Sequence, residues 1–150
     1  MNTKILFIYP TPFRVTGLSV GVASLCGMLK ANNYEVKVLD TAFYPELEKE
    51  CQIDVRAERM IGKRISQENY YWKRNTLDME EDFINIIRDF KPDIIGFSIL
   101  EPMFDLSLRI SKFIKREFKD TPIIAGGVFP SLSPEFLIHE DTFDIICIGD

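Results

Sequence analysis

The chain has 150 residues, of which 46% are hydrophobic and 27% are charged, and its net charge is -5 at pH 7. This composition is typical of a soluble domain with enough chain to bury one core, and it excludes a disordered protein. Basic residues are scattered among acidic ones, which argues against a nucleic-acid-binding face. No apolar run is long enough to cross a membrane, and no signal peptide precedes the first predicted strand. We therefore expect a cytoplasmic protein with neither nucleic-acid nor membrane partners.

The cysteine and histidine content excludes the common metal sites. Cys26, Cys51 and Cys147 lie far apart with no C-x-x-C spacing, so we expect reduced thiols rather than metal or iron–sulfur ligands. His139 is the single histidine and cannot form a metal site alone. There is also no Ser–His–Asp set and no obvious facing pair of carboxylates. The sequence therefore predicts neither a metal ligand nor a catalytic residue.

The first part of the chain predicts a strand, a helix and a second strand. Residues 4–9 are a continuous apolar run, which is typical of a central strand covered on both faces. After a loop with two prolines, apolar residues recur at helical spacing at Leu18, Val22, Leu25 and Leu29. Asn32-Asn33 is a plausible end for this helix. Residues 35–40 alternate enough to predict a less buried strand.

An insertion at about 41–76 fits no simple unit. It holds the aromatic cluster 70–72 and the most basic part of the chain, at Arg56, Arg59, Lys63, Arg64, Lys73 and Arg74. A structureless loop of this length is unusual, so we expect short helices. Two interpretations stay open: a solvated insertion over one strand end, or a lid or docking surface for a partner domain.

Regular periodicity returns in the second half. One amphipathic helix is indicated by Met79, Phe83, Ile86, Ile87 and Phe90, and another by Leu106, Ile110, Phe113 and Ile114. Strands are predicted at 93–99, 123–125 and 143–148, with a short helix at 134–139. Strand and helix thus alternate five times. The fold is therefore α/β, with a five-stranded parallel sheet, helices on both faces and a single domain over residues 1–150.

Ligands of such sheets bind beyond the carboxyl ends of the strands, where the winding reverses. The loops there are 10–17, 98–104 and 126–134, and five of the eight prolines lie in them. After the apolar run 123–125, Gly126-Gly127 can turn tightly or let a ligand approach bare backbone, and a stiff loop with free serine hydroxyls follows. An ordinary strand-to-helix turn explains this stretch equally well. With few ionisable groups, the loops resemble a binding rim rather than a reaction centre.

Several ligand classes can be excluded. The dinucleotide fingerprint G-x-G-x-x-G is absent after the first strand, and so is a phosphate-binding P-loop. The Ser- and Thr-dense phosphate loop of flavodoxins is absent too. A phospho-acceptor receiver domain needs acidic residues after the first strand and an aspartate at the end of the third, where this chain has Tyr9-Pro10 and Ser98. A rim with Phe13, Met103 and Phe129 suits a large, neutral and partly apolar ligand.

Five weak motifs in a specific order resemble one known family. They are Pro10…Gly17-Leu18, Glu35-Val-x-Val-x-Asp40, Asp93-Ile-Ile-Gly-Phe-Ser98, Gly126-Gly-Val-Phe-Pro-Ser131…Pro134-Glu135 and Asp144-Ile-Ile-Cys-Ile-Gly149-Asp150. Together they look like the N-terminal cobalamin-binding domain of cobalamin-dependent radical S-adenosylmethionine enzymes. That group includes the magnesium-protoporphyrin monomethyl ester cyclases and many methyltransferases. The resemblance covers nearly the whole chain apart from the insertion.

The resemblance implies a flavodoxin-like, doubly wound sheet that holds cobalamin at its carboxyl rim. Ser98, the Gly126-Gly127 turn and Ser131 would flank the nucleotide tail, while Gly17 and Leu18 would open the first helix beneath the corrin. The full set of implied cofactor-binding residues is Thr11, Gly17, Leu18, Ser98, Gly126, Gly127, Phe129 and Ser131. Other cobalamin domains carry Asp-x-His-x-x-Gly after the first strand, with a cobalt-ligating histidine. This chain has no histidine there, which favours the radical enzymes.

The catalytic half of such an enzyme is expected elsewhere. A radical domain needs a C-x-x-x-C-x-x-C loop for its iron–sulfur cluster, and no such spacing occurs in this chain. We therefore expect a downstream radical domain of the same polypeptide to bind the [4Fe-4S] cluster and S-adenosylmethionine, and this part to catalyse nothing alone. The alternative is a non-catalytic module of the same fold that binds another ligand or a protein instead of cobalamin.

Overall fold

The computed structural model describes residues 2–11, 19–44 and 78–149, and within these ranges five strands form one parallel sheet in the order β2-β1-β3-β4-β5. The strands are β1 (Lys4–Tyr9), β2 (Glu35–Asp40), β3 (Ile94–Ser98), β4 (Ile123–Gly126) and β5 (Ile145–Ile146). The helices are α1 (Val20–Ala31), α3 (Met79–Phe90), α4 (Phe104–Glu117) and α5 (Val128–Leu132), with short 3-10 turns η1 (Thr41–Phe43), η4 (Glu101–Met103) and η5 (Pro134–Phe136). The predicted doubly wound, flavodoxin-like sheet is confirmed.

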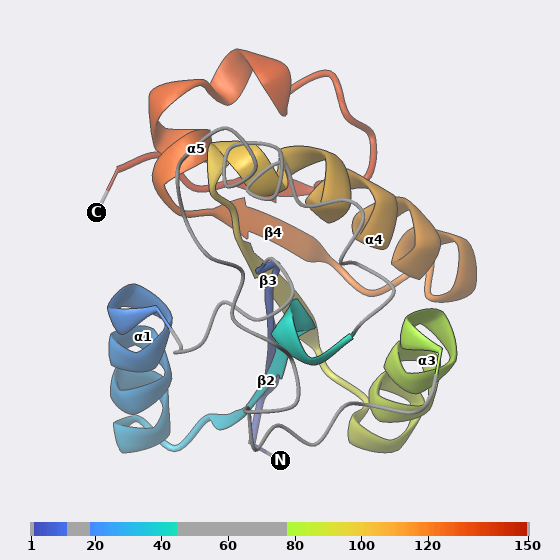
Figure 1. Ribbon diagram of the computed structural model, residues 1–150. Coiled ribbons are helices and arrows are strands. Elements are labelled where there is room, and N and C mark those ends of the chain that lie inside the picture. The colour runs from blue at the N-terminus through green and yellow to red at the C-terminus, as the bar shows by residue number, and fades with distance from the viewer. Residues whose placement is uncertain (1, 12–18, 45–77, 150) are drawn as a thin grey trace, which may run out of the picture.

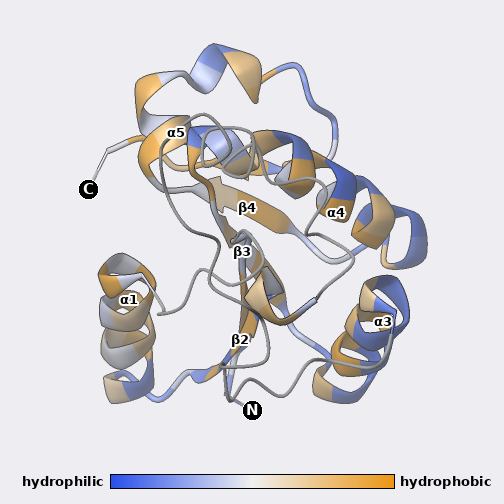
Figure 2. Ribbon diagram, viewed as in Figure 1, coloured by the Kyte–Doolittle hydropathy of each residue, from blue (hydrophilic) through white to orange (hydrophobic). Residues whose placement is uncertain are grey.

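Helices lie on both sides of the sheet, as Figure 1 shows: α1 on one side, α3 and α4 on the other. The larger core lies beneath α3 and α4, where Phe83, Ile95 and Ile123 are completely buried. A smaller cluster joins Tyr9 of β1 to Val22 and Cys26 of α1. Figure 2 shows hydrophobic residues concentrated in the strands, while α3 and α4 alternate between hydrophobic and hydrophilic residues along their length.

The ends of α3 follow directly from its sequence. The Asp78 carboxylate accepts hydrogen bonds from the backbone amides of Glu80 and Glu81 at 2.9 and 3.2 Å, which satisfies two amides that the first helical turn leaves unpaired. At the other end Lys91 adopts a left-handed conformation (φ 52°) immediately before Pro92. The predicted helix is confirmed, and it ends at Phe90, two residues before Pro92.

The predicted buried face of α1 is partly wrong. Val22 is buried as expected, but Leu25 is 43% exposed and Cys26, four residues after Val22, is buried instead. Within the described ranges, the buried residues of α1 pack against β1 and β2, so a narrow strip of the helix is covered. Leu18 lies outside the described residues. The insertion was expected to form short helices: η1 is one short turn at its start, and residues 45–77 lie outside the described part.

The stretch after β4 also differs from the prediction. Residues 128–132 form the helix α5 instead of a stiff loop, although Pro130 lies inside it. Proline is accommodated because the first turn of a helix does not use its backbone amides for internal hydrogen bonds. The predicted helix at 134–139 is only the 3-10 turn η5. The predicted strand 143–148 shortens to β5, but the Cys147 amide still donates to the Ala125 carbonyl at 2.8 Å.

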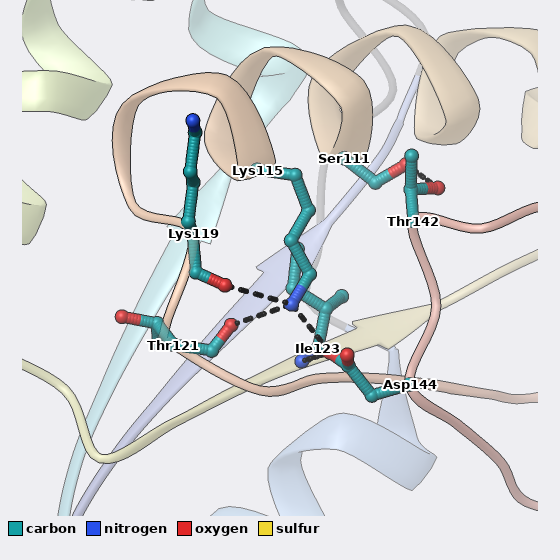
Figure 3. A network of polar contacts seen from close by, with 7 residues as sticks. All are labelled: Ser111, Lys115, Lys119, Thr121, Ile123, Thr142 and Asp144. Atoms are coloured by element: carbon teal, nitrogen blue, oxygen red, sulfur yellow. Dashed lines mark hydrogen bonds and ion pairs between the residues drawn. The ribbon is translucent and has the colours of Figure 1, made fainter.

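A polar network fastens the last strand to the rest of the sheet (Figure 3). The Lys115 Nζ lies 2.7 Å from Asp144 Oδ2 and donates to the Thr121 carbonyl at 3.1 Å. The same Asp144 oxygen accepts a hydrogen bond from the Ile123 amide at 2.6 Å. One carboxylate therefore joins α4, the start of β4 and the start of β5, on the edge of the sheet opposite the carboxyl ends of the strands.

Candidate functional site

The winding of the sheet reverses between β1 and β3, because β2 lies on the outer side of β1 and the later strands follow on the other side. Connections that leave the carboxyl ends of these two strands therefore turn to opposite faces of the sheet. An opening between such connections is where parallel sheets bind their ligands. The site predicted from the sequence lies at this edge, along the ends of β3 and β4.

Ser98 and Gly126 are paired across β3 and β4, at the last position of each strand. Side chains alternate between the two faces of a strand, so Ser98 shares a face with Gly96 and with Phe7, which pairs with Gly96. Phe7 packs against Val22 and Cys26, so this is the face that α1 covers. The Ser98 side chain is half-buried. Within the described ranges its hydroxyl makes no hydrogen bond, so it can pair with a ligand.

Gly127 has a structural reason to be glycine. Its φ is +105°, and a Cβ would lie 2.9 Å from the Ile99 amide nitrogen and 3.0 Å from the Ile99 carbonyl oxygen. The backbone therefore crosses that of Ile99 too closely for any side chain. The same crossing brings the Gly127 position against Ser98, whose Oγ would be 3.4 Å from that Cβ. Gly127 itself is exposed, so it presents bare backbone at the rim.

Ser131 is the fourth member of this group, but its hydroxyl is not free as the sequence suggested. It donates to the Gly127 carbonyl at 2.9 Å and accepts from the Gly149 amide at 3.1 Å. Ser131 thereby holds the glycine turn to the segment that follows β5. The structure brings Ser98, Gly126, Gly127 and Ser131 together, and Ser131 serves to position the other elements of the rim.

Phe129 and Thr11 occupy different surroundings. The Phe129 ring is half-buried between Phe104 and Phe136, at centroid distances of 5.2 and 5.9 Å. Thr11 is only 2% exposed. Its amide donates to the Thr41 hydroxyl at 2.7 Å, and its hydroxyl donates to the Asp40 carboxylate. Thr11 therefore lies toward β2, on the far side of β1 from the group around Ser98.

Two predicted residues, Gly17 and Leu18, lie outside the described residues. Met103, expected at the rim, is buried at 5% exposure beneath the start of α4. His139 is exposed in the connection that leads into β5. Across the described ranges, no group of three or more histidine, cysteine, aspartate or glutamate side chains could hold a metal ion.

The rim also exposes apolar residues that sequence reasoning missed. Leu100 is 40% exposed after β3, Val128 is 57% exposed after β4, and Ile148 is 66% exposed after β5. Each lies two residues after the last residue of its strand. The sequence signal that could have identified these residues is an apolar residue inside a loop that contains glycine or proline. Such side chains favour a ligand with extensive apolar surface.

Two groups in the cluster between β1 and α1 have raised pKa values, which favours their neutral forms. Burial raises the pKa of Tyr9 at the end of β1, and the charge of Asp40 acts in the same direction. Burial likewise raises the pKa of the thiol of Cys26, on the buried side of α1. The rim residues described above offer exposed backbone, the Ser98 hydroxyl and apolar surface for binding.

Comparisons with known proteins identify a family for this chain and structures that share its fold. Residues 12–150 match the sequence model of the family described as B12 binding domain. A comparison with curated proteins finds no match. None of the helices in the described ranges has the length and apolar character needed to span a membrane.

Solved structures share the fold at low sequence identity. Two are of the radical S-adenosylmethionine methyltransferase TsrM from Kitasatospora setae. The one with cobalamin and a [4Fe-4S] cluster bound has a TM-score of 0.62 and 18% identity, over 92% of this chain and 20% of that one. The one with tryptophan substrate and a SAM analogue has a TM-score of 0.60 and 17% identity, over 89% and 21%.

A third structure, a cobalamin-binding protein from Desulfitobacterium hafniense DCB-2, has a TM-score of 0.56 and 16% identity, over 97% of this chain and 52% of that one. The chain thus spans about a fifth of the TsrM chains and about half of the third. These likenesses establish the fold, and the family match extends over nearly the whole sequence. The chain belongs to the B12-binding domain family.

Proposed function

We propose that this domain binds cobalamin along the carboxyl rim formed by Ser98, Gly126, Gly127 and Ser131, and presents it to a radical S-adenosylmethionine domain of the same polypeptide. Membership of the B12-binding domain family assigns cobalamin as the ligand. The observation that supports this location is the meeting of Ser98 with the exposed backbone of Gly127 at the end of β3 and β4.

The described residues fit such a ligand. A large molecule with an extended tail needs bare backbone beside which it can lie, a hydrogen-bond donor and apolar surface. Gly126 and Gly127 supply the backbone, the Ser98 hydroxyl supplies the donor, and Leu100 and Val128 supply apolar surface. Bound cobalamin would supply an organometallic cobalt centre for group transfer or radical chemistry. The protein's part is to bind and orient it.

The remaining predicted contacts are part of the same proposal. Gly17 and Leu18 would approach the corrin from the loop after β1. Phe129 would act from the cluster that it forms with Phe104 and Phe136. Thr11, which is fully engaged with Asp40 and Thr41, would shape the end of β1 rather than reach the ligand through its hydroxyl.

The proposed partner is a following radical domain that holds the [4Fe-4S] cluster and S-adenosylmethionine. The likeness to TsrM supports this, since that methyltransferase carries cobalamin and a [4Fe-4S] cluster in one chain. A cytoplasmic location and the absence of a nucleic-acid partner belong to the same proposal. Iron and sulfide analysis of the natural full-length polypeptide tests the partner. We expect about four of each per chain, and their absence would contradict it.

Cobalamin binding is tested by mixing the purified protein with hydroxocobalamin and removing free cofactor by desalting. The protein fraction should keep the visible absorbance of the cofactor. A folded but colourless protein would contradict binding by residues 1–150. The measurement is repeated on the full-length polypeptide, because a second domain can complete a binding site.

A further inference from the structure

Tyr9 and Ser98 end two neighbouring strands at the point where the winding of the sheet reverses. Ile8 of β1 pairs with Phe97 of β3, so the next residues along the two strands lie side by side. Tyr9 belongs to the buried cluster with α1, and Ser98 lies on that same face of the sheet. Two hydroxyl-bearing side chains are therefore neighbours at the reversal, where parallel sheets bind their ligands.

The Tyr9 hydroxyl is nearly buried and has no partner in the part of the chain that the structure describes. Tyr9 is only 7% exposed, and a buried tyrosine hydroxyl usually finds a hydrogen-bond partner. The Tyr9 carbonyl accepts a hydrogen bond from the Thr11 hydroxyl, but the phenol takes part in none. No fully buried side-chain oxygen in the described ranges lacks a partner, so the Tyr9 hydroxyl keeps a small exposed area that a ligand can reach.

The surroundings of Tyr9 keep its hydroxyl protonated. Burial raises the pKa of the phenol, and the charge of Asp40, which is paired with Tyr9 across β1 and β2, acts in the same direction. A phenol that keeps its proton can donate a hydrogen bond. The Asp40 carboxylate is already engaged, since it accepts from the Thr11 hydroxyl and the Ala42 amide. Its negative charge repels anions, so an uncharged acceptor suits Tyr9 best.

The approach to the Tyr9 hydroxyl is narrow. Leu100 and Val128 lie two residues beyond their strand ends and are 40% and 57% exposed, so they can meet a broad apolar part of a ligand. Tyr9 lies at a strand end itself and is far less exposed. Gly126, paired with Ser98, adds no side chain at this level. A slender part of a ligand fits this position, and in cobalamin that part is the nucleotide tail rather than the corrin ring.

We propose that Tyr9 is a further cofactor-binding residue, whose hydroxyl donates a hydrogen bond to an uncharged acceptor atom of the cobalamin nucleotide tail beside Ser98. This rests on the proposed function, in which Ser98 and Gly126 line the cobalamin site. A nearly buried donor is left unpaired when the matching acceptor is missing, which costs affinity. Tyr9 therefore favours corrinoids that carry the tail over corrinoids that lack it.

Calorimetric titration of the full-length polypeptide with two corrinoids tests this inference. They are hydroxocobalamin and cobinamide, which has the same corrin without the nucleotide tail. Tyr9→Phe removes only the hydroxyl and keeps the ring that packs against Val22 and Cys26, so the fold should be retained. Tyr34→Phe is the matched control, because it removes the same group from a 40% exposed tyrosine before β2, at the opposite end of the sheet.

The two variants should behave differently. Loss of one neutral hydrogen bond should weaken the binding of hydroxocobalamin to Tyr9→Phe by roughly 2- to 12-fold and leave the binding of cobinamide unchanged. Tyr34→Phe should bind both corrinoids as the wild type does. Urea unfolding of each variant checks that it is folded.

Three results overturn the inference alone: undiminished hydroxocobalamin affinity in Tyr9→Phe, an equal loss of affinity for both corrinoids, or a loss of the same size in Tyr34→Phe. An equal loss would place the effect of the hydroxyl on the corrin or on the fold instead of the tail. Folded wild type that binds neither corrinoid overturns the proposed function, and this inference with it.

Discussion

The Gly149 amide donates a hydrogen bond to the Ser131 hydroxyl over 3.1 Å, across 18 residues of sequence. The same hydroxyl donates to the Gly127 carbonyl at 2.9 Å. One small side chain therefore fixes the glycine turn after β4 against the segment after β5. The end of β5 carries only a two-residue ladder, so this bond is a main restraint on how the chain leaves the rim.

Replacing Ser131 by alanine should release Gly149. A neutral hydrogen bond contributes about 0.5–1.5 kcal/mol, so amide exchange at Gly149 should accelerate by roughly 2- to 12-fold in Ser131→Ala. The measurement is hydrogen exchange followed by NMR. Ser131→Thr keeps the hydroxyl and should retain the protection. Equal exchange rates in wild type and Ser131→Ala would show that the bond restrains nothing.

Two glycines should respond in opposite directions to alanine. Gly127→Ala forces a Cβ to 2.9 Å from the Ile99 nitrogen at φ +105°, and should lower the free energy of unfolding by about 1–3 kcal/mol.

Gly27 lies within α1 with nothing within 4 Å of an added Cβ. Gly27→Ala should therefore raise the free energy of unfolding by about 0.5–1 kcal/mol. Urea titration measures both, and a Gly127→Ala protein as stable as wild type would disprove the close backbone crossing.

The Asp144 network predicts a pH-dependent stability. Burial is the largest influence on the pKa of Asp144 and acts to raise it. Hydrogen bonds from Lys115 and the Ile123 amide, with the Lys115 charge, outweigh burial and hold the pKa below its ordinary 3.8. A lowered folded-state pKa stabilises the fold above about pH 4, and this contribution is lost as the pH falls through the folded-state value.

The unfolding temperatures of wild type and Asp144→Asn should thus differ by a constant amount near neutral pH. The difference should shrink as the pH falls below about 4. In a Lys115→Met background, the pH-dependent part of this temperature difference should diminish, because the charge that lowers the pKa of Asp144 is gone. A difference that stays constant through the acid range would remove this role of Asp144.

The sequence was sufficient for the sheet and most helices because those signals are local. Continuous apolar runs mark β1 and β3, and Asp78 and Pro92 mark the limits of α3. The α1 face could not be predicted in the same way. The spacing of Leu25 and Leu29 gives a helix, but which residues are buried depends on how many strands the helix covers.

The structure brings four of the predicted site residues together at the carboxyl ends of β3 and β4, but their contacts could not be predicted. Gly126-Gly127 indicated a tight turn, whereas the approach of Gly127 to Ile99 depends on the pairing of β3 with β4. The hydrogen bond from Thr11 to Asp40 joins residues 29 positions apart, which no local pattern reveals. A proline such as Pro130 indicates a loop, and its place in the first turn of α5 depends on where that helix begins, which no local pattern reveals.

Calorimetric titration of hydroxocobalamin into wild type, Ser98→Leu and Gly126→Leu tests most directly whether the rim holds the cofactor. A Cβ at Gly126 meets only ordinary contacts, 3.6 Å from Cys147 Cβ, so these variants place bulk at the rim without the backbone strain expected at Gly127. Wild type should bind one equivalent. Both variants should bind at least about tenfold more weakly, a loss of about 1.4 kcal/mol, with little change in urea unfolding. Undiminished affinity in two folded variants, or no binding by folded wild type, would contradict a cobalamin site at Ser98 and Gly126.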